Sequence, residues 1–130
     1  MTAPNAKMST PSATILVIDD DEDSVEALVE LLRVSGYRAI PAHSAAEALD
    51  LLDERRDIDL VVSDVRMPGV DGLDLIRVLR HRFPALRTIL ISGAPLTDDD
   101  VIPREASVIL PKPVALEQLQ AAIVATLKRS

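Results

Sequence analysis

The chain has 130 residues, no cysteine and a formal net charge of −7, and 48% of its residues are apolar. This length and composition fit one packed domain, and the missing cysteines exclude disulfides and thiolate metal sites. The acidic balance argues against nucleic-acid binding, and the lack of a membrane-length apolar run or a signal pattern predicts a cytoplasmic protein without membrane contact.

Residues 1–12 are small, polar and punctuated by proline, which predicts a flexible tail before a single domain over residues 13–130. Short aliphatic runs predict strands at 14–18, 37–40, 58–63, 88–91 and 107–110. Helical spacing of apolar residues predicts helices over 24–34, 71–82 and 116–127, and a capping box at 44–47 opens another.

Three further signals shape the connections. Gly36 is placed to end the first helix, and the stretch MPGVDG at 67–72 reads as a turn. An additional helix should start near Thr97, but Pro103 falls inside it and predicts a short or irregular element.

Strands that alternate with helices predict an α/β fold with a parallel sheet covered on both faces. Five such units suit an open, doubly wound (βα)5 sheet with strand order 2-1-3-4-5. In sheets of this kind, ligands gather at the carboxyl ends of the strands.

Polar residues follow four of the predicted strands, namely Asp19, Asp20 and Asp21, then Asp64, Ser92 and Lys112. Clustered carboxylates suit Mg²⁺, which takes one or two of them together with waters and a phosphate oxygen. A carboxylate beside such an ion can attack phosphorus, while an ammonium and a hydroxyl stabilise the phosphoryl oxygens. The set therefore predicts acceptance of a phosphoryl group on an aspartate.

Other interpretations of these residues are weaker. Asp19, Asp21, Asp23 and Glu30 match positions 1, 3, 5 and 12 of a calcium loop, but Ser24 replaces the glycine such a loop needs. An aliphatic strand also precedes the stretch where a helix should be. A solvated turn would explain the three consecutive aspartates by themselves. It would not explain why Asp64, Ser92 and Lys112 also follow predicted strands.

The two histidines, His43 and His81, lie far apart and neither follows a predicted strand. We therefore expect both to be surface residues rather than metal ligands or phosphocarriers.

Four stretches of the sequence resemble the receiver domain of two-component response regulators: ILVIDDDEDS (15–24), LVVSDVRMPGVDGLDLI (60–76), ILISG (89–93) and PKP (111–113). They occur in the family's order, and the resemblance covers about residues 13–129. It implies a flavodoxin-like receiver fold that is phosphorylated on aspartate.

The resemblance also implies roles for individual residues. Asp64 would be the phosphoacceptor and, with Asp19, Asp20 and the backbone carbonyl of Arg66, would hold Mg²⁺. Asp20 would be the more direct ligand, and Asp19 would act partly through water.

At the last two strands, the resemblance implies that Ser92 turns toward the phosphoryl group and that Lys112 bridges to it, or to Asp64 before phosphorylation. It also implies a cis peptide bond between Lys112 and Pro113. Ile109 stands where receivers usually carry an aromatic residue, which predicts a different or weaker readout of phosphorylation.

As a member of this family, the chain would be a stand-alone receiver and not an enzyme with a separate substrate. A histidine kinase or histidine phosphotransfer protein would donate the phosphoryl group, and an unidentified downstream protein would receive the signal. We expect a monomer or weak dimer. Two alternatives remain open: an interaction module that acts without phosphorylation, and the receiver portion of a hybrid histidine kinase.

Overall fold

The computed structural model describes residues 13–67, 70–93 and 108–128. The predicted tail over residues 1–12 and the irregular helix expected near Thr97 lie outside this part of the chain. The strands are β2 (Thr14–Ile18), β3 (Arg38–Ala42), β4 (Leu60–Asp64), β5 (Arg66–Met67), β6 (Val70–Asp71), β7 (Arg87–Ser92) and β8 (Val108–Pro111). The helices are α2 (Glu22–Val34), α3 (Ala45–Glu54), α4 (Gly72–Arg82) and α5 (Leu116–Lys128).

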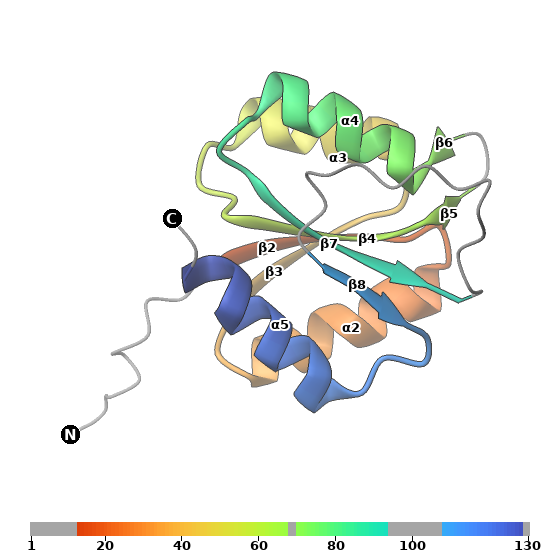
Figure 1. Cartoon of the computed structure of the whole chain (residues 1–130), viewed down its shortest axis with the longest axis vertical. Helices are drawn as coiled ribbons and strands as arrows, with labels where there is room; N and C mark the ends of the chain where they lie inside the picture. The colour runs from red at the N-terminus through yellow and green to blue at the C-terminus, as the bar shows by residue number, and fades with distance from the viewer. Residues whose placement is uncertain (1–12, 68–69, 94–107, 129–130) are drawn as a thin grey trace.

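Five strands form one parallel sheet in the order β3-β2-β4-β7-β8. Counted along the chain without the small hairpin, this is the order 2-1-3-4-5, so the predicted doubly wound fold is confirmed. Helices α3 and α4 cover one face of the sheet, and α2 and α5 cover the other (Figure 1).

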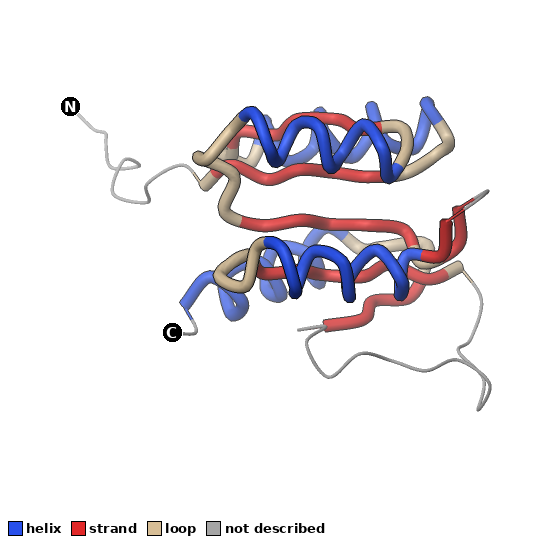
Figure 2. The backbone as a smooth tube through the Cα atoms, turned by 90° about the horizontal axis from the view of Figure 1, so that it is seen from above, coloured by secondary structure: helices blue, strands red, loops and turns tan. Residues whose placement is uncertain are grey.

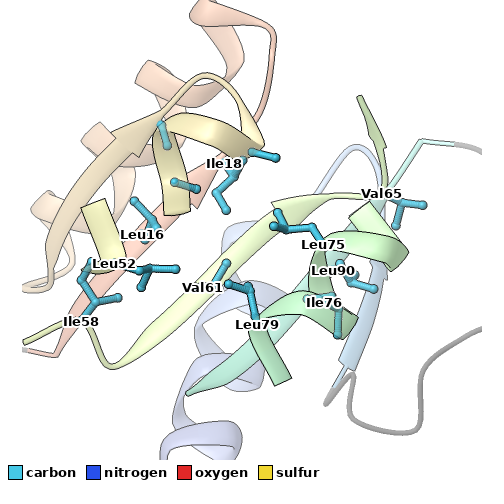
Figure 3. Packing of buried hydrophobic residues seen from close by; sticks show 13 residues of the cluster. Leu16, Ile18, Leu52, Ile58, Val61, Val65, Leu75, Ile76, Leu79 and Leu90 are labelled. Carbon is cyan, nitrogen blue, oxygen red and sulfur yellow. The ribbon is translucent and has the colours of Figure 1, made fainter. Parts of the chain in front are cut away.

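Each face of the sheet has its own apolar core. Figure 3 shows the core beneath α3 and α4, where Leu16, Val61 and Leu90 of three strands lie with Leu52 and Leu79 of the helices. The opposite core joins the strands to α2 and α5, and includes Ile15, Val62, Ile89, Val25, Leu119 and Ile123. Every such fully buried side chain contributes about 1.5–3 kcal/mol of transfer free energy. Burial on both sides explains why the strand sequences are continuously aliphatic.

The edge strand β3 extends beyond the predicted end at residue 40 and includes Pro41 and Ala42. Proline cannot donate a backbone hydrogen bond, but an edge strand has one unpaired side and tolerates it. Among the described strands β3 pairs only with β2, where Pro41 is in register with Val17. The strand therefore ends two residues after the predicted boundary.

Two predicted helix boundaries are confirmed. Gly36 follows α2 with φ +101°, a backbone conformation that favours glycine. Ser44 is the N-cap of α3, and its Oγ accepts a hydrogen bond from the Glu47 N–H at 3.1 Å. Glu47 Oε1 in turn accepts from the N–H of His43 at 2.7 Å, one residue earlier than in a standard capping box.

A two-stranded antiparallel hairpin, β5–β6, follows β4 where the sequence had predicted only a turn. Arg66 pairs with Asp71, and Met67 with Val70. Figure 2 shows the hairpin projecting at one end of the sheet. It connects the carboxyl end of β4 directly to the start of α4.

Candidate functional site

The carboxyl ends of the strands bring the predicted polar residues together. Asp64 is the last residue of β4, and Ser92 is the last residue of β7. Asp19 follows β2, and its N–H donates to Ala42 O at 3.1 Å. Lys112 follows β8, and its N–H donates to Ser92 O at 2.8 Å. These backbone bonds continue the ladders of the sheet past the strand ends and fix the positions of both residues.

Lys112 forms the central ion pair of the site. Its Nζ lies 3.1 Å from Asp64 Oδ2 and 3.6 Å from Asp19 Oδ2. The side chains of Asp64 and Asp19 are only 10% and 11% exposed, whereas that of Lys112 is 36% exposed. Burial by itself would lower the pKa of Lys112, but the hydrogen bond and charge of Asp64, followed by those of Asp19, raise it overall.

The three carboxylates that were predicted to hold a metal converge. Asp19, Asp20 and Asp64 each offer an oxygen, and these oxygens lie within 4.8 Å of one another. Asp20 is exposed, and the carboxylate of Asp19 also accepts the Asp21 N–H at 3.0 Å. Hard, negatively charged oxygens at this spacing fit Mg²⁺, with room on the solvent side for the waters that this ion retains.

Ser92 ends β7 in register with Pro111 of β8, and Gly93 follows it. Ser92 is buried, with 6% of its surface exposed. A Cβ added to Gly93 would lie 3.5 Å from Lys112 Cδ, which is ordinary van der Waals contact. An alanine at position 93 would therefore make one van der Waals contact with the Lys112 side chain that glycine does not make.

Two further predictions concern the backbone around the site. The peptide bond between Lys112 and Pro113 is cis, as predicted. Arg66 lies in β5, two residues after Asp64, so its backbone belongs to the segment that leaves the site. The role of its carbonyl as a metal ligand stays a prediction.

The histidine prediction is wrong on one point, the position of His43, whereas His81 is exposed as expected. His43 directly follows β3, because that strand runs to Ala42, and it therefore lies at the same edge of the sheet as the aspartates. Its Nδ1 lies 3.3 Å from Glu47 Oε1, and the side chain is 40% exposed. This contact with the first turn of α3 gives His43 a local structural role rather than one in the acidic cluster.

Residues 15–124 match the family described as the response regulator receiver domain. The chain belongs to this family. The match covers every strand end described above, so the sequence resemblance is confirmed.

Among curated proteins, the receiver domain is 41% identical over 120 residues to the transcriptional regulatory protein CpxR of Escherichia coli strain K12. It is 38% identical over 121 residues to the response regulator MprA of Mycobacterium bovis. These alignments cover 89% and 92% of this chain but 50% and 52% of the relatives. The receiver domain thus spans about half the length of the curated relatives it matches.

Solved structures show the same fold. A response regulator receiver domain protein from Clostridium thermocellum has a TM-score of 0.84 and 31% identity, covering 90% of this chain and 95% of that one. The response regulator TrrA from Thermotoga maritima, solved in complex with Mg²⁺-BeF, has a TM-score of 0.80 and 27% identity, covering 88% of this chain and 98% of that one. Of the helices described in the receiver domain, none has the length and apolar character to span a bilayer.

Proposed function

We propose that this receiver accepts a phosphoryl group on Asp64, with Mg²⁺ held by Asp19, Asp20, Asp64 and the carbonyl of Arg66. The observation that carries the proposal is the position of Lys112 Nζ, 3.1 Å from Asp64 Oδ2 at the edge of the acidic cluster. A cation held against one carboxylate is suited to bind the phosphoryl oxygens that this carboxylate would acquire. The complex of the relative TrrA with Mg²⁺-BeF supports the choice of metal.

The donor is a phosphohistidine of a histidine kinase or histidine phosphotransfer protein. An oxygen of Asp64 forms the new bond to phosphorus, while the bond from phosphorus to the histidine nitrogen breaks and its electron pair stays with the imidazole. The ammonium group of Lys112 then exchanges its contact with the carboxylate for a contact with the phosphoryl oxygens. The hydroxyl of Ser92 donates a hydrogen bond to one of these oxygens. Mg²⁺, when bound, offsets the negative charge that gathers as the phosphoryl group approaches the carboxylates.

Phosphorylation then shifts an equilibrium between two conformations of the face that carries Ser92 and Ile109. The protein assists its own phosphorylation and dephosphorylation but has no separate substrate. Its output is a change in binding to a downstream protein in a cytoplasmic phosphorelay.

Incubation with acetyl phosphate and Mg²⁺ tests the proposal. The wild-type protein should gain the mass of one phosphoryl group, in a bond that is stable in acid and cleaved by base or hydroxylamine. Asp64→Asn should gain none, because an amide lacks the nucleophilic oxygen of a carboxylate.

The matched control is Asp23→Asn, which removes an exposed carboxylate from the first turn of α2 and should label like the wild type. Equal labelling of Asp64→Asn would mean that another residue is the acceptor. A wild-type protein that binds Mg²⁺ but does not label would favour the interaction module that acts without phosphorylation.

A further inference from the structure

A cavity lies at the opposite end of the sheet from Asp64. It has a volume of about 750 Å³, and its lining includes Ala13 before β2, Asp59 before β4 and Arg87 at the start of β7. Because the strands are parallel, these amino ends are a full strand length from the carboxylate cluster. In Figure 1 the end of the sheet where β2 begins and α5 ends lies away from the β5–β6 hairpin.

The floor of this cavity is apolar, and its rim is basic. The apolar side chains include Leu52, Ile58, Phe83, Leu86 and Leu127. The rim carries four of the chain's 14 basic residues, namely Arg55, Arg56, Arg82 and Arg87. The helix dipole favours basic residues at helix C-termini, which accounts for Arg82 in the last turn of α4 and for Arg55 and Arg56 directly after α3, but not for Arg87 at the start of β7. It does not account for four of them around one apolar cavity in a protein of net charge −7.

Three of these arginines, Arg55, Arg56 and Arg82, keep donors available for a further partner. Arg55 contacts Asp57 through Nε and Nη2, and Arg82 contacts Asp53 through Nη2 alone, so each guanidinium retains unused N–H groups. Within the described residues Arg56 has no ion-pair partner.

Asp57 and Asp53 offset part of the charge of Arg55 and Arg82, but neither carboxylate lines the cavity. Asp59 is the single acidic residue in the described lining, and its Oδ2 already accepts the Thr14 N–H at 2.8 Å. Arg82 also lies over the ring of Phe83, 5.4 Å from its centroid, which holds the guanidinium beside the apolar floor. The rim therefore presents unused guanidinium donors, and the charge of Arg56, next to apolar side chains.

We propose that this cavity binds an acidic peptide segment of a partner protein, with one apolar side chain of the segment inserted between the arginines. The positively charged arginines favour an acidic segment, and the apolar side chains of the cavity floor favour an apolar residue within that segment. The side chains of Arg55 and Arg82 are each 41% exposed, so the rim of the cavity is open to solvent. An open rim suits a peptide that lies across the surface better than a small molecule, which is usually enclosed by its site. Because the cavity is remote from Asp64, this contact would hold a partner in either phosphorylation state.

A short fluorescein-labelled peptide of sequence Glu-Glu-Phe-Glu-Glu-Leu-Glu tests the proposal by fluorescence anisotropy and by amide chemical shifts. We expect saturable binding that weakens with added salt and shifts confined to residues 52–59 and 82–87. The same peptide with glutamine in place of glutamate should not bind. Arg56→Gln and Arg82→Gln should each weaken binding by about tenfold, the effect of losing one hydrogen bond to a charged group.

Arg77→Gln is the matched control, because Arg77 is an exposed arginine of α4 that pairs with Asp74 and does not line the cavity. Its binding should equal that of the wild type, as should that of Asp64→Asn. The proposal is overturned if no saturable binding occurs, or if Arg77→Gln weakens binding as much as Arg56→Gln. It is also overturned if benzoate saturates the same amides as tightly as the peptide, since the occupant would then be a small carboxylate.

Discussion

Lys112 reaches across β7 to place its Nζ 3.1 Å from Oδ2 of Asp64, so the residue after β8 is tied to the last residue of β4. The same ammonium lies 3.6 Å from Asp19 after β2. One cation thus offsets two largely buried carboxylates that would otherwise repel each other. The ion pair between Lys112 and Asp64 therefore belongs to the candidate site and also stabilises the folded sheet at this edge.

Alkaline titration should reveal this ion pair. The pKa of Lys112 is raised above its usual value of 10.5. A lysine whose pKa rises on folding stabilises the folded state below its unfolded pKa, and that contribution is lost as pH rises through the folded pKa. The difference in unfolding free energy between wild type and Lys112→Met should therefore be largest at neutral pH and should shrink above the usual lysine pKa.

Urea denaturation over this pH range measures the difference. Lys128→Met, at the end of α5, is the control and should give a difference that does not change with pH. A Lys112→Met difference that is equally flat would remove the ion pair as a source of stability.

Removal of the exposed carboxylate of the cluster should separate metal affinity from folding. Asp20→Asn should weaken Mg²⁺ binding at least about tenfold, because it removes a charged oxygen ligand. Without Mg²⁺ it should leave the unfolding free energy unchanged or higher, since one repulsive charge is gone. Calorimetric titration with MgCl₂ and urea denaturation measure the two effects, and Mg²⁺ affinity equal to that of the wild type would exclude Asp20 as a ligand.

Ile109 should report the activated conformation without an aromatic ring. It packs against the core beneath α3 and α4, whereas Ile123 belongs to the core on the opposite face. In methyl-labelled protein, beryllofluoride with Mg²⁺ should shift the Ile109 resonances and leave those of Ile123 in place. A shift of equal size at both methyl groups, or at neither, would contradict a change centred on β8.

The strand order and the acidic cluster were predictable because each functional residue directly follows an aliphatic run. The parallel topology brings all strand carboxyl ends to one edge of the sheet. No other long-range information was needed to predict that Asp19, Asp64, Ser92 and Lys112 lie close together. The β5–β6 hairpin was missed because its strands have two residues each, too few for a periodic signal.

The arginine-rimmed cavity could not be predicted from local patterns. Arg56, Arg82 and Arg87 come from three segments, and only the packing of α3 and α4 on the sheet brings them to one opening. His43 was misplaced for a different reason, since the strand predicted to end at residue 40 continues through Pro41 and Ala42, which an edge strand allows.

Two glycines should respond in opposite directions to the same substitution. Gly93 has no positive φ, and a Cβ there would contact the Lys112 stem at 3.5 Å. Gly93→Ala should therefore raise the unfolding free energy by about 0.4–1 kcal/mol, mainly by restricting the unfolded chain. Gly36 has φ +101° with no atom within 4 Å of an added Cβ, so the cost of Gly36→Ala is one of backbone conformation alone and should be about 1–2 kcal/mol. Urea denaturation of both variants at neutral pH compares them directly, and a destabilised Gly93→Ala protein would show that the backbone beside Ser92 needs glycine after all.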